Sequence, residues 1–229
     1  MTRVIIATHK SWNIRHYHAW ATARPHVSSL IQEPSDLTLD IVAGFAPDYI
    51  FFPHWSYKIP AAIYERYECI VFHMTNLPFG RGGSPLQNLL AQGIYETQIS
   101  ALRVAEAIDA GPIYMKRPLC LHGSASEIYI RASQIIFEMI DDILEHRPAP
   151  APQTGTVVEF RRRTPAESEI PLLPNLFLLH DFIRMLDAEG YPPAFLTHGG
   201  FHYEFSRAVL RDGHIVADVK IVPVEEKTK

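Results

Sequence analysis

The chain has 229 residues, of which 47% are hydrophobic and 20% are charged, and its formal net charge at pH 7 is -4. This composition is sufficient for one large domain, or for one domain with a small appendage. The acidic balance counts against a broad nucleic-acid-binding surface, which needs a basic patch to displace counterions from phosphates. We therefore expect no nucleic-acid partner.

The N-terminal segment has a short apolar run that polar residues interrupt, and the other apolar runs are no longer than a strand. These lengths predict neither a signal peptide nor a membrane span, so we expect a cytoplasmic protein with no membrane partner. The two cysteines, Cys69 and Cys120, each lie in an apolar run. They show no spacing typical of a disulfide framework or a metal site, and we expect inert core thiols.

Three runs of β-branched or aromatic residues predict buried strands in the first part of the chain. They are residues 3–8 (RVIIAT), 49–52 (YIFF) and 69–72 (CIVF), with helical segments between them. Pro60 has the position of a first helical residue. Buried strands that alternate with helices are typical of an α/β fold with a parallel sheet.

The middle of the chain predicts further elements of the same kind. We expect a helix at residues 84–92, strands at 98–103 and 113–121, and a long helix at 124–145. Ser124 and Glu127 have the spacing of a capping box at the start of this helix. The apolar residues from 128 to 143 recur at helical spacing and predict a core-facing stripe.

A Pro-rich stretch, residues 146–156 (HRPAPAPQTGT), cannot sustain a helix or a central strand. We place a domain boundary there, which gives a catalytic domain at residues 1–150 and a small α+β domain at 151–229. The second domain is predicted to hold a strand at 157–163, a helix at 180–186, and strands at 202–210 and 214–221. An Asp-Gly hairpin turn joins the last two strands.

His73 is the first candidate for chemistry, because it directly follows the predicted strand 69–72. Parallel sheets bind ligands outside the carboxyl ends of their strands, and histidine can give and take a proton near neutral pH. The following LPFGRGG offers backbone N–H groups close to a ligand. A lone histidine at a strand end can equally be a hydrogen-bonded structural residue, and these residues alone leave both interpretations open.

Residues 73–113 resemble the catalytic segment of the 10-formyltetrahydrofolate-dependent formyltransferases. That family has Asn-x-His, a loop ending in Leu-Pro, Arg-Gly-x-x-Pro, a glycine after a helix, and Asp-x-Gly-Pro. The matching positions here are His73, Leu77-Pro78, Arg81-Gly82-Gly83-Ser84-Pro85, Gly93 and Asp109-Ala110-Gly111-Pro112. The resemblance implies a Rossmann-like formyltransferase domain that uses 10-formyltetrahydrofolate as formyl donor.

The resemblance also implies that His73 stabilises the tetrahedral intermediate and shuttles protons, while Asp109 orients it. The family asparagine that donates to the formyl oxygen falls at Val71, so another donor is needed. Asn76 is our first candidate, with Thr75 or a backbone N–H as alternatives, although Asn76 can also be an ordinary turn residue. The implied folate site comprises Phe72, Leu77, Gly82, Gly83, Ile108 and Asp109.

Two features direct the expected acceptor towards an amino sugar. The C-terminal part is smaller than the barrel of methionyl-tRNA formyltransferases, and residues 160–170 and 180–195 resemble bacterial nucleotide-sugar N-formyltransferases. A narrower resemblance, through residues 72–89, 183–195 and 204–208, is to the N-formyltransferases of the pseudaminic-acid pathway. This implies a UDP- or dTDP-linked amino-dideoxy sugar as substrate and a homodimer. The alternatives are a truncated methionyl-tRNA-type or other small-amine formyltransferase, or a folate- or nucleotide-sugar-binding protein that has lost catalysis.

Polar and aromatic residues at three strand ends are candidates for binding this substrate. Lys10 could meet a diphosphate, Trp12 could stack on a ring and Asn13 could bond hydroxyls, although an aromatic residue at a strand end is more often packing. The full expected set is His9, Lys10, Trp12, Asn13, His54, Thr75, Phe79 and Arg81. No histidine pair has the spacing of a helix-borne metal site, and we expect no metal.

Overall fold

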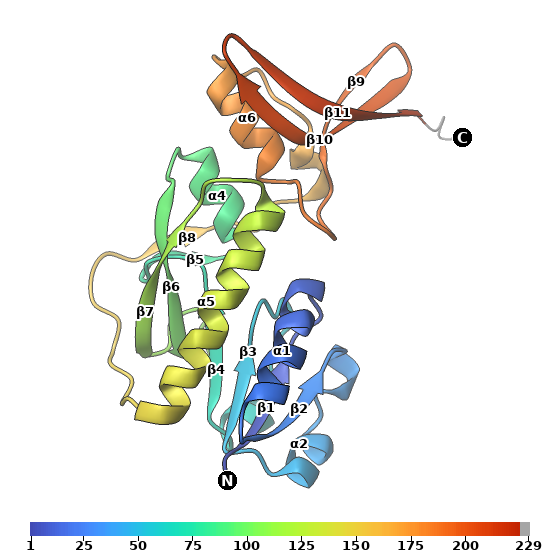
Figure 1. Ribbon diagram of the computed structural model, residues 1–229. Coiled ribbons are helices and arrows are strands. Elements are labelled where there is room, and N and C mark those ends of the chain that lie inside the picture. Colours follow the sequence, from blue (N-terminus) through green and yellow to red (C-terminus); the bar gives the residue numbers. More distant parts are fainter. Residues whose placement is uncertain (225–229) are drawn as a thin grey trace. The chain divides into compact units, whose positions relative to one another are not determined.

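The structure is a computed structural model that describes residues 1–224, and the chain divides into two compact units (Figure 1). Unit 1 comprises Met1–Gly82, Glu96–Leu119 and Tyr129–Phe160, and unit 2 comprises Gly83–Tyr95, Cys120–Ile128 and Arg161–Lys229. This division differs from the expected boundary at residue 150, because two earlier segments belong with the C-terminal part. In the described residues, no helix is long and apolar enough to cross a membrane.

A six-stranded sheet forms the centre of unit 1, in the order β2-β1-β3-β4-β6-β7 (Figure 1). The strands are β1 (Arg3–Ala7), β2 (Val27–Ile31), β3 (Tyr49–Phe52), β4 (Cys69–His73), β6 (Glu96–Arg103) and β7 (Ile113–Cys120). Strands β2, β1, β3 and β4 are parallel, and β6 is antiparallel to β4. The predicted α/β fold with a parallel sheet is confirmed, and the parallel strands end together at the edge that carries His73.

Helices cover both faces of this sheet. On one face α1 (Ser11–Ala23) lies beside α5 (Ala125–His146), where the Trp20 indole N–H donates to Asp141 Oδ1 at 2.7 Å. On the other face lie η1 (Pro34–Asp36), α2 (Leu39–Phe45) and α3 (Ala61–Tyr64), and Val42 and Ile63 join the core cluster that includes Phe52. The sheet is therefore buried on both faces, as expected for its continuous apolar strands.

The polar segment after β1, where we expected substrate-binding residues at a strand end, is helical from Ser11 onwards. Helix α1 begins at Ser11, and its N-cap residue, Lys10, makes no side-chain capping bond. Trp12 and Asn13 consequently lie in the first helical turn, and both are buried. Without an N-cap side chain, the sequence carries no local signal for this helix start.

The Pro-rich stretch runs along unit 1 and does not separate two domains. Ala151 and Ile113 exchange two backbone hydrogen bonds of 2.7 and 2.9 Å. Further on, β8 (Val158–Phe160) pairs in parallel with β5 (Phe79–Gly82). The strand expected at 157–163 therefore ends before the arginines, and the stretch borders the segment that follows His73.

In unit 2, α4 (Pro85–Ala91) follows the Gly-rich segment as expected, and the start of α5 has the predicted capping box. Glu127 Oε2 accepts from the Ser124 N–H at 2.7 Å, and Ser124 Oγ accepts from the Glu127 N–H at 3.3 Å. The remaining elements are η2 (Pro165–Ser168), α6 (Leu176–Arg184), β9 (Ala194–His198), β10 (Phe201–Arg211) and β11 (His214–Pro223).

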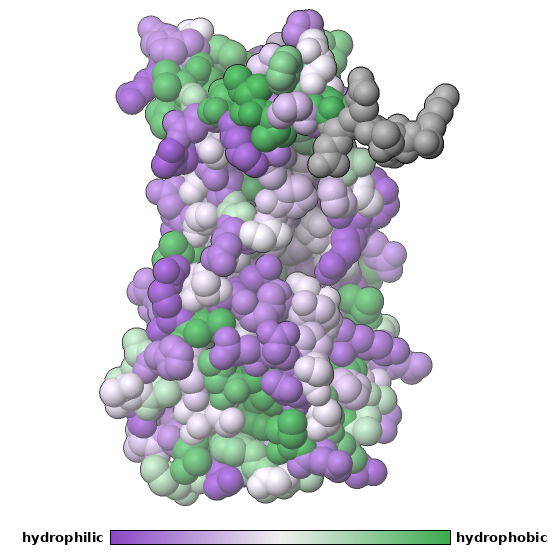
Figure 2. Space-filling view, turned by 90° about the vertical axis from the view of Figure 1, so that its right-hand side faces the viewer, coloured by the Kyte–Doolittle hydropathy of each residue, from purple (hydrophilic) through white to green (hydrophobic). Residues whose placement is uncertain are grey.

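The last three strands form an antiparallel sheet in the order β11-β10-β9, and the predicted Asp-Gly hairpin joins β10 to β11. Hydrophobic residues of unit 2 are exposed at the surface near this three-stranded sheet, as the green atoms in Figure 2 show. Phe201, Val219 and Ile221 are each at least 44% exposed. Asp181 and Arg184 form a buried ion pair within α6. Arg184 Nη1 also donates to Leu121 O and Gly123 O, both at 2.6 Å, and these bonds fix α6 within the unit.

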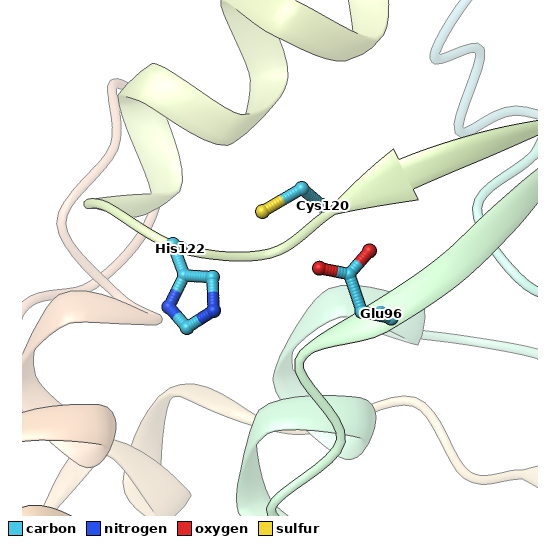
Figure 3. A group of neighbouring side chains, drawn as sticks. All are labelled: Glu96, Cys120 and His122. Atoms are coloured by element: carbon cyan, nitrogen blue, oxygen red, sulfur yellow. The ribbon is translucent and has the colours of Figure 1, made fainter.

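Neither cysteine forms a disulfide. Burial raises the pKa of the Cys69 thiol to about 12, which makes it an inert core residue. Figure 3 draws Cys120, the last residue of β7, together with His122 in the loop after it and Glu96 at the start of β6. Glu96 belongs to unit 1 and the other two to unit 2. Within unit 2 the His122 ring stacks on Tyr95, with 5.6 Å between centroids.

Candidate functional site

His73 ends β4, and its side chain is only 9% exposed. Its Nε2 lies 2.7 Å from Gly80 O, and its Nδ1 lies 3.4 Å from Asp109 Oδ2. Because a carbonyl oxygen can only accept, Nε2 carries a hydrogen and donates it to Gly80. A proton that arrives on the other side of the ring, at Nδ1, meets a carboxylate. The geometry suits a histidine that takes up and returns one proton.

Asp109 is held in place by its own backbone and by the Gly-rich segment. Its φ is 52°, in the left-handed region, where a residue other than glycine costs roughly 1–2 kcal/mol. Its Oδ2 accepts from the Gly82 N–H at 2.9 Å, so one carboxylate oxygen faces both Gly82 and His73. Backbone strain that the surroundings maintain is typical of functional turns.

Gly82 allows the close approach of β5 to β8. Its φ is 102°, and a Cβ at this position would lie 2.4 Å from Phe160 O. Any side chain there would force the two strands apart. The glycine therefore has two roles, since it admits the neighbouring backbone and presents its own N–H to the carboxylate of Asp109.

Asn76, our first candidate for the missing amide donor, is oriented by Lys116. Lys116 Nζ donates to Asn76 Oδ1 at 2.6 Å and to Leu77 O at 2.5 Å, and burial lowers its pKa. With Oδ1 engaged, Nδ2 is the atom of Asn76 that a substrate oxygen would meet. Thr75, the alternative donor, is fully buried, and its hydroxyl donates to Gly80 O at 3.3 Å.

His54 follows β3 and joins the polar residues of the same sheet edge. The Trp12 indole N–H donates to His54 Nδ1 at 3.3 Å, so Nε2 carries the hydrogen, and it faces Met74 Sδ at 3.0 Å. Burial lowers the pKa of His54 to about 3, with Lys10 and His9 acting in the same direction. His54 is therefore neutral near pH 7 and cannot serve as a second acid there.

Asn13 connects the ends of two strands. It is fully buried, and its Nδ2 donates to Thr8 Oγ1 and to Pro53 O, both at 3.2 Å. Among the described residues, its Oδ1 has no hydrogen-bond partner, and the same is true of His9 Nδ1 and Trp55 Nε1. Buried polar atoms are normally paired with protein, water or ligand, so these three indicate where a polar molecule is expected.

Comparison with known proteins identifies the family. Residues 165–222 match the family model described as methionyl-tRNA formyltransferase, C-terminal domain. A solved structure of methionyl-tRNA formyltransferase from Clostridium thermocellum is 48% identical, with a TM-score of 0.96, over 97% of this chain and 100% of that one. The chain belongs to the formyltransferase family.

Other similarities involve longer proteins. Methionyl-tRNA formyltransferase of Anaplasma phagocytophilum is 23% identical over 180 residues, which are 69% of this chain and 60% of that protein. The formyltransferase chain described here therefore spans less than two thirds of the length of this curated relative. HypX from Aquifex aeolicus, solved in complex with tetrahydrofolic acid, has a TM-score of 0.75 at 17% identity, over 90% of this chain and 37% of that one. This last likeness shows the fold alone.

Two expectations from the sequence are wrong. We expected a nucleotide-sugar acceptor and no nucleic-acid partner, but the 48% identical structure and the curated relatives are methionyl-tRNA formyltransferases, which act on a tRNA. The net charge of -4 misled us because it averages over the whole surface, whereas an interface depends on local contacts.

The structure of this formyltransferase family member places the predicted site residues in two groups. His73, Asp109 and Gly82 are in direct contact, and Trp12, Asn13 and His54 form the second group. The other predicted residues belong to neither group. Phe72 and Leu77 are buried, and Ile108 is 77% exposed. The Phe79 ring lies against Phe160, the His9 ring contacts Tyr57, and Lys10 Nζ lies 5.7 Å from the Trp12 ring. Gly83 belongs to unit 2.

Two residues that the sequence did not indicate contact the site. Lys116 comes from the middle of β7, and Gln153 comes from the Pro-rich stretch. Arg81, which we expected to bind substrate, donates from Nε and Nη2 to Gln153 Oε1 at 3.2 and 2.8 Å. No local pattern marks either residue, since each reaches the site only through the tertiary fold.

Proposed function

We propose that this chain transfers a formyl group from 10-formyltetrahydrofolate to the α-amino group of methionyl-tRNA. The observation that carries the proposal is the contact between His73 and Asp109 at the carboxyl edge of a parallel sheet. The formyltransferase family uses 10-formyltetrahydrofolate, which supplies the formyl carbon when it is bound. The acceptor is inferred from the 48% identical methionyl-tRNA formyltransferase, which this chain matches over nearly its whole length.

The folate would bind at the turn that precedes Asp109. Residues 105–108 are all exposed, and the Ile108 side chain is 77% exposed. A flat heterocycle with polar edges needs an apolar surface on one side and backbone groups that can donate and accept at its rim. An open turn with a protruding aliphatic side chain offers both, and it ends at the carboxylate that faces His73.

His73 and Asp109 would manage the proton of the acceptor amine. An amine attacks a carbonyl carbon only in its neutral form, and it must lose a further proton once the new C–N bond exists. The nitrogen of tetrahydrofolate must gain a proton when its bond to the formyl carbon breaks, so the proton taken from the acceptor can be returned there. His73 Nδ1 and Asp109 Oδ2 are 3.4 Å apart, and a proton from the acceptor could be held between these two basic atoms. The bond from Nε2 to Gly80 O fixes the other side of the ring, so the imidazole keeps its orientation while Nδ1 changes protonation.

Asn76 would supply the hydrogen bond that the family asparagine provides elsewhere. Val71 occupies the family position, and its side chain packs against the core cluster of unit 1. Because Lys116 engages Asn76 Oδ1, the Nδ2 hydrogens are available for the formyl oxygen. An oxyanion donor of this kind is typically worth roughly 10²–10³ in rate.

The decisive experiment is a formylation assay with the full chain and 10-formyltetrahydrofolate. We expect formylmethionine on methionyl-tRNA, and no comparable product with uncharged tRNA, with free methionine or with a nucleotide-linked amino sugar. Formylation of another amine without any methionyl-tRNA product would overturn the acceptor. Tight binding of both ligands in calorimetry, with no product after long incubation, would show that the chain binds them without catalysis.

A further inference from the structure

Gln153 connects the two loops of the site through a single side-chain amide. Its Nε2 donates to Asp109 O at 2.7 Å and to Gly111 O at 2.8 Å, and its Oε1 accepts from Arg81 Nε and Nη2. A primary amide has two N–H donors and one oxygen with two lone pairs, so every hydrogen-bonding position of Gln153 is in use. An exposed glutamine with an incidental contact would not be saturated in this way.

The turn bound by Gln153, Asp109–Gly111, has a backbone conformation that needs support from its surroundings. Asp109 has a left-handed backbone, and a Cβ on Gly111 would lie 1.8 Å from Arg103 O, so the turn presses against the end of β6. Gln153 binds the carbonyl oxygens of Asp109 and Gly111, the residues on either side of Ala110. It therefore fixes the backbone before and after Ala110. The carboxylate of Asp109 leaves this turn towards His73, and its position follows that of the backbone.

The Pro-rich stretch is anchored on both sides of Gln153. Two residues before it, Ala151 pairs with Ile113 at the start of β7, and five residues after it β8 begins beside β5. Proline favours extended backbone and lowers the entropy of such a segment in the unfolded chain. The backbone on both sides of Gln153 is therefore fixed. A side chain can hold another residue in position only when its own backbone is fixed in this way.

We propose that Gln153 is a positioning residue that holds the Asp109 carboxylate at His73. It acts through Asp109 and need not touch either substrate. The kinetic consequence rests on the proposed function, because it presumes that Asp109 and His73 handle the proton. The structural consequence, a displaced carboxylate beside the His73 ring, does not depend on any acceptor.

The test uses three variants of the full chain. Gln153→Ala removes the whole bridge, while Gln153→Glu keeps the contact with Arg81 and loses both donors to the Asp109 turn. Gln134→Ala is the control, because Gln134 is exposed on α5 and its side chain donates to Glu138 of the same helix, away from the site residues. The ring ¹⁵N resonances of His73, assigned with a His73→Gln variant, report the surroundings of Nδ1 without substrate.

We expect both Gln153 variants to shift the His73 Nδ1 resonance and to lower kcat by on the order of tenfold to a hundredfold, with little change in KM. Combining Gln153→Ala with Asp109→Asn should cost no more than Asp109→Asn alone, since both act on one group. Gln134→Ala should change neither readout.

An unchanged His73 resonance in both Gln153 variants, or losses that multiply in the double variant, would overturn the positioning role. If Gln153→Ala fails to fold, the comparison of Gln153→Glu with the wild type decides. A wild-type chain that transfers no formyl group to methionyl-tRNA contradicts the proposed function instead, and the resonance measurement still tests Gln153.

Discussion

The replacement Asp109→Asn separates the chemical role of the site from its structural role. A single oxygen, Oδ2, faces both the Gly82 N–H at 2.9 Å and His73 Nδ1 at 3.4 Å. In the variant, the amide oxygen must take this position, because the amide nitrogen would place a donor against the Gly82 donor. The variant then keeps an oxygen next to the Gly82 N–H and next to His73 Nδ1, and it loses only the negative charge beside His73.

The two consequences differ greatly in size. General acid–base catalysis contributes roughly 10²–10⁴ in rate, so we expect kcat/KM to fall by about that factor. A hydrogen bond to a charged acceptor is worth only about 1 kcal/mol more than one to a neutral acceptor, and asparagine tolerates left-handed backbone at least as well as aspartate. The free energy of unfolding should therefore change by about 1 kcal/mol or less.

The assay follows formation of formylmethionine on the tRNA, and thermal unfolding of the same preparation reports stability. Asp40→Asn serves as the control, because Asp40 is exposed on α2. Near-wild-type turnover of Asp109→Asn would refute the role of the carboxylate. A fall in unfolding temperature large enough to account for the lost activity would refute the claim that the variant preserves the site.

Three further predictions concern single residues. The pKa of His54 is lowered to about 3, so between there and its unfolded value of 6.5 the unfolded chain binds the extra proton. The free energy of unfolding should therefore decrease as the pH is lowered through that window, by up to about 1.4 kcal/mol per pH unit. The urea midpoints of His54→Asn should lack this part of the pH dependence. Asn76→Asp keeps the contact with Lys116 and removes the amide donor, so formyl transfer should fall by roughly 10²–10³ without loss of thermal stability. Gly82→Ala places a Cβ 2.4 Å from Phe160 O at a φ of 102°, and urea unfolding should show a loss of about 2 kcal/mol or more.

The sheet of unit 1 could be predicted from the sequence because burial on both faces leaves a simple pattern. The apolar runs at residues 3–8, 49–52 and 69–72 correspond to β1, β3 and β4 within one residue at each end. Parallel strands place their carboxyl ends at one edge, which is why the histidine at the end of β4 could be connected with a ligand site from the sequence.

The details of that edge could not be predicted, because they depend on where α1 begins. The segment after β1 has the polar composition of a turn, and Lys10 gives no capping signal. The helix is instead stabilised by packing, with the Trp12 ring stacked on Tyr129 of α5 at 5.1 Å. This contact spans more than a hundred residues of sequence, and no local pattern can report it.

The Pro-rich stretch shows a different limit. Its composition predicts a linker, since proline excludes both a helix and a central strand. Extended backbone that borders a sheet has the same composition, and only the tertiary contacts of Ala151 and Gln153 distinguish the two cases. A boundary drawn from composition at residue 150 consequently divides the segment that the site needs intact.

Val71 connects these observations. It lies on the same face of β4 as Cys69, and its partly buried side chain packs against the apolar cluster of unit 1, where an amide would lie against hydrocarbon groups. A chain that fills this position with valine strengthens its core and must take its hydrogen-bond donor from another element. The loop after His73 offers Asn76, and Lys116 fixes the direction of its amide. Under the proposed function, Asn76 takes the place of the family asparagine, and Lys116 orients its amide towards the formyl oxygen.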